Sequence, residues 1–243
     1  PYVPIGRPWA LISWLSLGLG TLLGARWAYV ELGWAGHWAW DPAENAPLLP
    51  WLTATALLHS LMFRGSRMKI SHIALSVATF ALCIFGTFIT RSGMISSVHA
   101  FSVSTIGLYF VGYLALIVFI SVALSFKRLA GLRSAKEAAS LVSRPSALLL
   151  AIVLLVAATA AILIGTLFPV ISETINVALT SDYVNLSTAV IVGPLILLMG
   201  ICPFTTWKGD TLGALARYLA APFVGAVITG ILLVLLGLRD PLG

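Results

Sequence analysis

The sequence predicts an all-α membrane protein, a polytopic transmembrane helical bundle of about seven spans, and its composition carries that prediction. Hydrophobic residues make up 60% of the 243 residues, charged residues make up only 9%, and the mean hydropathy is +1.04. Soluble domains are about 45–50% apolar and about 25% charged, so a water-soluble fold is excluded. The two cysteines and the lack of low-complexity tracts exclude a disulfide scaffold and disorder. No segments of about ten residues alternate as the strands of a membrane β-barrel would, which leaves helices.

Seven apolar runs are each long enough to cross a hydrocarbon core of about 30 Å. The second run is short, and Pro50 lies near its first turn, where proline is tolerated. We treat residues 1–243 as a single membrane domain. Because residue 1 is Pro and not Met, we expect the chain to be part of a longer protein. The expected spans are 8–29, 47–63, 71–90, 105–126, 145–168, 187–206 and 218–238.

The basic residues orient these spans. Eleven of the 14 Lys and Arg residues fall at the N-terminus or in the second, fourth and sixth connections, which the positive-inside rule assigns to the cytoplasm. Six of the eight acidic residues fall on the opposite side. The net charge of +6 therefore reports membrane topology, and no nucleic-acid partner is expected. The outward-facing loops are then 30–46, 91–104 and 169–186.

Four of the eight tryptophans fall within residues 31–51, ELGWAGHWAWDPAENAPLLPW. Tryptophan favours membrane interfaces, but an aromatic belt spreads over several helix ends and these four are concentrated in one segment. The concentration favours a flat aromatic platform for a large planar ligand, because indole supplies rigid apolar area and one N–H donor. A porphyrin fits such a platform best, although composition does not separate it from a quinone or a sterol. The four residues are Trp34, Trp38, Trp40 and Trp51.

The segment Asp41-Pro42-Ala43-Glu44 predicts the start of the second helix. Asp at the N-cap, Pro at the first helical position and Glu at the third form a capping box. This structural role accounts for both acidic residues, and it also holds the tryptophans against a rigid helix start.

Two histidines are candidate metal ligands. His59 lies inside the second span, roughly 18 Å below its outer end, where an ionisable side chain is a functional hypothesis by default. It is either a neutral histidine bonded to a helix carbonyl or an axial ligand of haem iron. His99 lies in an outer loop with Arg91 on the same membrane face, and a guanidinium suits carboxylates such as haem propionates. His37 is packing or a ligand with equal weight, and His72 is expected to have an interfacial role.

The cysteines carry no predicted chemistry. Cys83 and Cys202 are single residues inside spans and are expected to pack there. No histidine pair has zinc spacing, and without a C-x-x-C motif this chain is not expected to perform thiol exchange.

Three spaced motifs resemble the CcmF-type haem lyase subunit of cytochrome c biogenesis, within the wider haem-handling group marked by a Trp-rich ("WWD") periplasmic loop. The segment from RPWALISW to TALLHS at 7–60 follows the family's core almost throughout. TFITRSGMISSVHAF at 87–101 is the second motif, and LIGTLFPVISE at 163–173 is the third. The resemblance covers essentially the whole chain.

The resemblance implies two haem b groups. Substrate haem would sit against the Trp-rich loop with His99 as an axial ligand, and its vinyl groups would be joined to the Cys thiols of apocytochrome c. A second haem would lie within the membrane with His59 as an axial ligand. The residues that match the haem-handling loop are Trp34, Trp38, Trp40, Asp41, Pro42, Glu44 and Asn45.

The resemblance also implies a location and partners. The chain would lie in the inner (cytoplasmic) membrane, with its haem site on the periplasmic side. Apocytochrome c, a haem chaperone and thiol-handling maturation subunits would be its partners, alongside membrane lipid.

Two departures from the family pattern matter. The family loop usually reads GGWWFW or similar, whereas this chain reads AGHWAW, with His37 in place of a Trp and Ala39 in place of a bulky aromatic residue. These changes thin the platform and add a candidate ligand. Each haem site of the family also takes two histidines, and the partners of His99 and His59 are expected outside this chain.

Three functions remain open at this point. A haem lyase core would act by positioning, and no residue here is an obvious general base. A small-molecule or haem transporter would show repeated halves with helices broken at the midplane, and no clear repeat is present. An electron-transfer b-type cytochrome usually has paired intramembrane histidines, and only His59 is deep.

Overall fold

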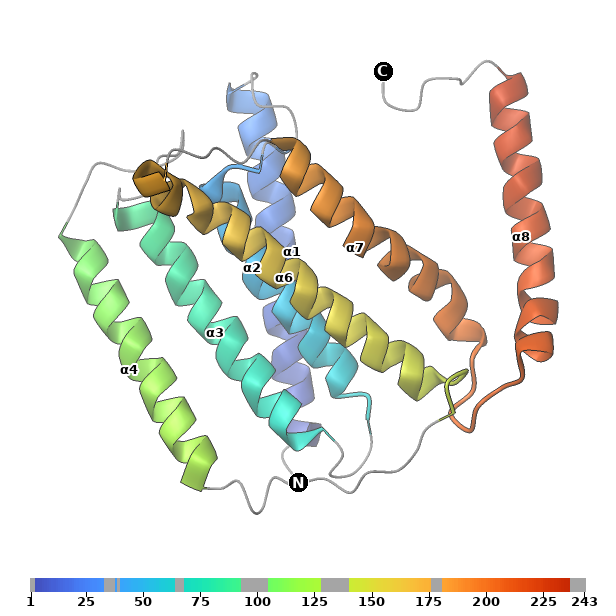
Figure 1. Cartoon of the computed structure of the whole chain (residues 1–243), viewed down its shortest axis with the longest axis horizontal. Helices are drawn as coiled ribbons and strands as arrows, with labels where there is room; N and C mark the ends of the chain where they lie inside the picture. The colour runs from blue at the N-terminus through green and yellow to red at the C-terminus, as the bar shows by residue number, and fades with distance from the viewer. Residues whose placement is uncertain are drawn as a thin grey trace. The chain divides into compact units, whose positions relative to one another are not determined.

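The computed structural model describes residues 3–32, 38, 40–63, 68–92, 105–127, 140–175 and 181–236. Within these ranges every regular element is helical, which confirms the predicted all-α class. The elements are α1 (Val3–Leu32), α2 (Pro42–Ser60), α3 (Lys69–Ser92), α4 (Ile106–Lys127), α6 (Arg144–Ile175), α7 (Ser181–Ile201), the 3-10 turn η1 (Cys202–Phe204) and α8 (Leu212–Leu235) (Figure 1).

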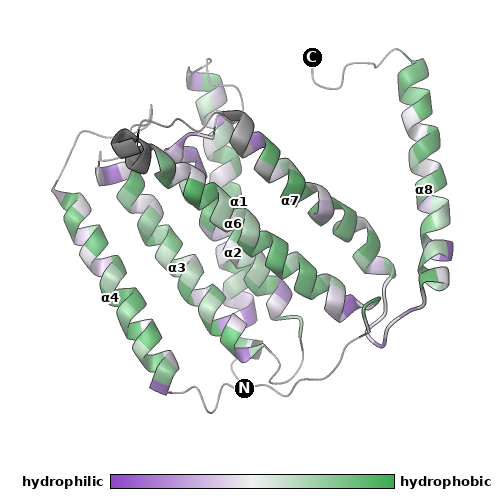
Figure 2. Cartoon of the chain, viewed as in Figure 1, coloured by the Kyte–Doolittle hydropathy of each residue, from purple (hydrophilic) through white to green (hydrophobic). Residues whose placement is uncertain are grey.

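Each of the seven expected spans falls on one of these helices. Five described helices are long and apolar enough to cross a membrane, namely those beginning at Val3, Lys69, Ile106, Arg144 and Leu212. Apolar residues predominate along α4 and α8 (Figure 2), and large side chains such as Leu108 and Phe119 of α4 are mostly exposed. A helix that is apolar and exposed in this way has lipid as its surroundings. The chain is a multi-pass membrane protein.

Two of the expected outer loops are shorter than predicted. The helix α1 runs on to Leu32 and α2 already begins at Pro42, so the loop expected at 30–46 is limited to 33–41. Likewise, α6 continues to Ile175 and α7 begins at Ser181, within the loop expected at 169–186. Apolar runs mark only the part of a helix inside the hydrocarbon, whereas backbone hydrogen bonding continues beyond it until a cap ends the helix.

The described helices fall into two compact units. The first unit comprises residues 1–136 and 149–195, and the second comprises residues 137–148 and 196–243. In the first unit α2 packs against both α1 and α3, and α3 also packs against α4. Figure 1 shows these helices in blue to green. In the second unit, the segment before α6 contacts the connection between η1 and α8. Asp210 N–H in that connection donates to Val142 O at 2.8 Å.

The antiparallel pair α2 and α3 is held at both ends. Near the start of α2, Gly86 of α3 lies so close to Ala46 that a Cβ on the glycine would be 3.2 Å from the Ala46 carbonyl oxygen. At the other end, His72 Nε2 of α3 donates to Ser60 O of α2 at 2.9 Å. Small residues let membrane helices approach closely where no hydrophobic force drives their association. This pair therefore forms the frame on which the site is built.

The contact between α3 and α4 depends on a second glycine. A Cβ added to Gly107 would lie 2.7 Å from Cβ of Ser92, which is fully buried, so one backbone would have to move. In contrast, a Cβ added to Gly112 on the same helix would meet no atom of another described element within 4 Å.

We expect Gly107→Ala to destabilise the protein by about 1–3 kcal/mol, as overpacking does in other cores. Gly112→Ala is the matched control, and it should be neutral or stabilising by up to about 1 kcal/mol because alanine favours helix. The measurement is unfolding of both variants in detergent. Equal stability of the two variants would show that α3 and α4 do not pack through Gly107.

Candidate functional site

Tryptophan rings gather where the chain leaves α1 and enters α2. Trp38 and Trp40 meet edge to face, with ring centroids 5.9 Å apart and planes at 86°. Trp51, three turns into α2 by count, stacks on Trp14 of α1 with centroids 5.7 Å apart and planes at 21°. Both geometries are favourable for aromatic pairs. The fourth predicted member of the platform, Trp34, lies outside the described residues.

Three of these rings wall an apolar cavity of about 390 Å³ between α1 and α2. A second cavity of about 220 Å³ also borders Trp38 and includes Glu44 in its lining. The Trp38 Nε1 atom is buried and has no hydrogen-bond partner in the part of the chain that the structure describes. The residues around the first cavity are Gly18, Thr21, Leu22, Trp38, Trp40, Leu48 and Trp51.

Glycine and threonine bring α1 close enough to complete this cavity. A Cβ on Gly18 would lie 2.7 Å from Nε1 of Trp51, so glycine is what admits the indole against the α1 backbone. Trp14 Nε1 then donates to Thr55 Oγ1 of α2 at 2.8 Å. At Trp51 the platform is therefore packed between α1 and α2. This ring does not lie freely at the membrane interface.

Trp40 has a strained backbone. Its φ is +59°, which places it in the left-handed region, where a residue with a Cβ costs about 1–2 kcal/mol. Its carbonyl accepts from Asn45 Nδ2 at 2.9 Å, and its indole Nε1 donates to Asn185 Oδ1 of α7 at 2.9 Å. A hydrogen bond contributes about 0.5–1.5 kcal/mol, so these two bonds together are comparable with the strain. Strained residues held in this way cluster at functional sites.

Asn45 connects the loop to the interior of the bundle. Besides Trp40 O, its Nδ2 donates to Thr166 Oγ1 of α6 at 3.0 Å, across 121 positions of sequence. Asn45 is 3% exposed and Thr166 is 2% exposed, so water does not compete for this bond. Sequence reasoning included Asn45 in the loop but assigned no role to Thr166, which stands in the motif at 163–173.

The predicted capping box is present at the start of α2. Asp41 Oδ2 accepts from Ala43 N–H at 3.0 Å, and Glu44 Oε2 accepts from Asp41 N–H at 3.4 Å. Pro42 occupies the first helical position. These contacts give Asp41, Pro42 and Glu44 a structural role directly beside the tryptophans.

His59 lies in the last turn of α2. His59 is about 26 Å along α2 from Pro42 and about 18 Å from residue 47, where the expected span begins. Its Nδ1 contacts Thr55 O at 2.7 Å. A carbonyl only accepts, so the ring donates from Nδ1 and a neutral imidazole keeps its lone pair on Nε2. This is the tautomer that presents Nε2 to a metal.

His72, for which an interfacial role was expected, is buried within the protein. It is 4% exposed, and its Nε2 donates to Ser60 O, next to His59 in sequence. The Ser60 carbonyl in the last turn of α2 accepts from Phe63 N–H at 3.2 Å, and the imidazole of the neighbouring helix gives its second lone pair a partner. The signal that sequence reasoning missed is the proximity of two helix ends in an antiparallel pair.

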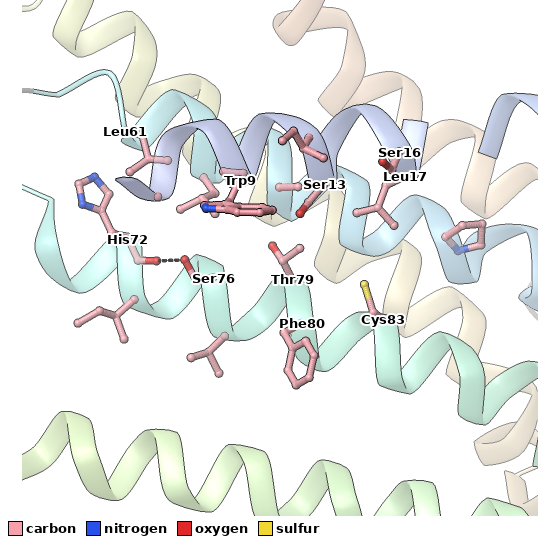
Figure 3. Close-up of a pocket in the computed structure, with 18 of the residues that line it drawn as sticks. Trp9, Ser13, Ser16, Leu17, Leu61, His72, Ser76, Thr79, Phe80 and Cys83 are labelled. Carbon is pink, nitrogen blue, oxygen red and sulfur yellow. Dashed lines mark hydrogen bonds between the residues drawn. The ribbon is translucent and has the colours of Figure 1, made fainter. Parts of the chain in front are cut away.

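His72 also borders a groove of about 990 Å³ over α2, between α1 and α3. Figure 3 shows Trp9, Ser13 and Ser16 along α1 facing Ser76, Thr79 and Cys83 along α3. Several of the hydroxyls donate within the protein, as Ser76 Oγ does to His72 O at 2.7 Å. Cys83, which was expected to pack within its span, is half-buried and lines this groove.

The remaining predicted residues are distributed as follows. Arg91 lies exposed in the last turn of α3, at the same end of the pair as the start of α2. His37, Ala39 and His99 lie outside the described residues.

Comparison with known proteins gives a consistent family. Residues 4–99, which contain nearly all of α1, the whole of α2 and α3 and the four tryptophans of the platform, match the family described as cytochrome C assembly protein. The chain is 42% identical to the cytochrome c-type biogenesis protein CycK of Bradyrhizobium diazoefficiens, over 93% of this chain and 35% of that protein. It is 37% identical to CcmF of Escherichia coli, over 96% of this chain and 37% of that protein. The chain spans about a third of the length of these curated relatives. No solved structure gives a significant match.

We expect Asp41→Ala to lower the free energy of unfolding by about 1 kcal/mol, because the first turn of α2 loses its N-cap acceptor. Asp41→Asn should retain most of the stability, since an asparagine oxygen also caps. Thermal unfolding in detergent measures both. If Asn costs as much as Ala, the charge of Asp41 matters and its capping oxygen does not.

Proposed function

We propose that this chain, which belongs to the CcmF-type cytochrome c-type biogenesis proteins, is the haem-handling part of a cytochrome c maturation haem lyase. Its task would be to bind haem at the periplasmic face of the inner membrane and present it for attachment to apocytochrome c. The observation that carries the proposal is the cavity of about 390 Å³ walled by Trp38, Trp40 and Trp51. The names of the relatives support a role in cytochrome c maturation.

The cavity has the properties that a porphyrin requires. Pockets for small molecules and cofactors are typically about 300–1,000 Å³ and lined mainly by apolar and aromatic side chains, and this cavity of about 390 Å³ lies within that range. Indole rings offer flat, rigid contact area. The surface that this cavity exposes is entirely apolar, so it suits the macrocycle of a haem, while its propionates would need partners elsewhere.

The chain would act mainly by positioning. Haem supplies vinyl groups; when a cysteine thiol adds across one of them, sulfur bonds to one carbon and hydrogen to the other, without net electron transfer. The tryptophans would set the haem plane, and the cap at Asp41 would keep them fixed relative to α2. Holding reactants in one geometry lowers the barrier because rotational freedom is lost beforehand. We assign no residue of this chain as general base.

A second haem within the membrane is part of the proposal. His59 offers its Nε2 lone pair because its Nδ1 proton is donated to Thr55 O. His99, in the outer loop, would serve the substrate haem, with Arg91 as a propionate contact and His37 as an additional candidate. The second axial ligands would come from the remainder of a longer protein, and haem-chaperone and thiol-handling subunits would complete the assembly.

The first prediction of this proposal concerns the platform. Replacing Trp38 and Trp40 together by Ala should lower the yield of holocytochrome c about tenfold or more, since losing about 1.4 kcal/mol of contact with haem is a factor of ten. The yield is measured as covalent haem in apocytochrome c, with the change made in the full-length protein.

Trp9→Ala is the matched control, because Trp9 is 68% exposed and lies on α1 away from the platform. An unchanged yield of holocytochrome c from the double variant would show that Trp38 and Trp40 act only as aromatic residues of the membrane interface. Haem binding without any thioether product in the unaltered protein would favour haem transport instead.

The second prediction separates the two histidines. His59→Ala should remove the embedded haem and leave the outer loop able to take up haem, while His99→Ala should do the reverse. About 26 Å of helix lies between Pro42 at the start of α2 and His59. One haem would therefore not bind both His59 and a histidine of the outer loop. Haem content and Soret position of each variant are the measurements. Loss of both haems from either change, with the fold intact, would contradict two sites.

A further inference from the structure

The motif at 163–173 has no part in the proposed chemistry, yet the structure joins it to the tryptophan loop. Asn45 Nδ2 carries two protons, and the two acceptors it reaches are Trp40 O at 2.9 Å and Thr166 Oγ1 at 3.0 Å. One amide group therefore ties the residue before the helix cap to the middle of α6.

The Thr166 hydroxyl determines which atom donates in its bond with Asn45. The Thr166 hydroxyl donates its own proton to Ile162 O at 2.7 Å, so its oxygen can only accept from Asn45. Trp40 O, a carbonyl, also accepts. The Asn45 Oδ1 atom is buried without a partner among the described residues, so the two donated bonds alone orient this amide.

These bonds act on the strained residue of the site. Trp40 holds φ at +59°, and its ring is placed by its edge-to-face contact with Trp38 and its bond to Asn185. A residue with a Cβ leaves the left-handed region once the contacts that hold it are lost. Movement of the Trp40 carbonyl would rotate the peptide plane and tilt the indole.

We propose that Thr166 is a positioning residue for the tryptophan platform: through Asn45 it holds the backbone of Trp40 in its left-handed conformation and so sets the plane in which the platform binds its ligand. The part that concerns haem rests on the proposed function. The part that concerns Trp40 does not.

The test compares three substitutions on α6. Thr166→Val keeps the shape of the side chain but removes the acceptor, and Thr166→Ser restores a hydroxyl. Thr159→Val is the matched control, because Thr159 is also buried on α6 and its hydroxyl donates only to Leu155 O of its own helix, at 2.8 Å. Asn45→Ala, alone and combined with Thr166→Val, completes a double-mutant cycle.

The first readout needs no haem. Near-ultraviolet circular dichroism of the full chain in lipid nanodiscs reports the Trp38–Trp40 pair, with the double Trp→Ala variant as baseline. We expect Thr166→Val and Asn45→Ala to change this signal alike, their combination to add nothing, and Thr166→Ser to restore it. An unaltered signal in Thr166→Val, or an equal change in Thr159→Val, would overturn the proposal.

The second readout is haem titration of the same samples. Thr166→Val should weaken binding about two- to tenfold, the equivalent of one hydrogen bond, and alter the Soret circular dichroism. If the double Trp→Ala variant binds haem like the unaltered chain, the proposed function fails, while the haem-free result still decides the role of Thr166. If haem binding needs the tryptophans but ignores Thr166→Val, only the inference fails.

Discussion

The arrangement at the start of α2 depends on the left-handed backbone of Trp40. An L-residue avoids this conformation, so it has to be held by bonds from elsewhere, and the structure supplies them from Asn45, which is itself bonded to α6, and from Asn185 of α7. With the backbone held, the Trp40 ring meets Trp38 edge to face, and Asp41 is placed to cap α2. Platform geometry and helix start are thus consequences of one conformation.

The helices α1, α2 and α3 associate through close packing and hydrogen bonds. Because lipid is as apolar as the side chains, burial of apolar area gives little reason for membrane helices to associate, and close packing and hydrogen bonds take its place. Gly86 admits Ala46, Gly18 admits Trp51, and Trp14 donates to Thr55. Since α2 takes part in all three contacts, any change in its position would be felt on both neighbouring helices.

The two described histidines near the C-terminal end of α2 use opposite nitrogens. His59 donates from Nδ1 to its own helix and keeps Nε2 for another partner, whereas His72 donates from Nε2 to the last turn of α2. The first arrangement suits a metal ligand and the second a structural tie. Because His72 bonds to Ser60, it also fixes the turn that carries His59, so the orientation of the candidate ligand depends on α3.

Sequence alone determined the seven helices, the capping box at Asp41 and the family, because hydropathy, caps and motifs are properties of neighbouring residues. It placed His59 on the second helix and, from the capping box, the start of that helix at Pro42, ahead of the apolar run that begins at 47. Only the tertiary structure decided the burial of His72, the strain at Trp40 and the bond between Asn45 and Thr166. That bond spans 121 positions, and no local pattern encodes which distant hydroxyl a buried amide will meet once the helices have packed.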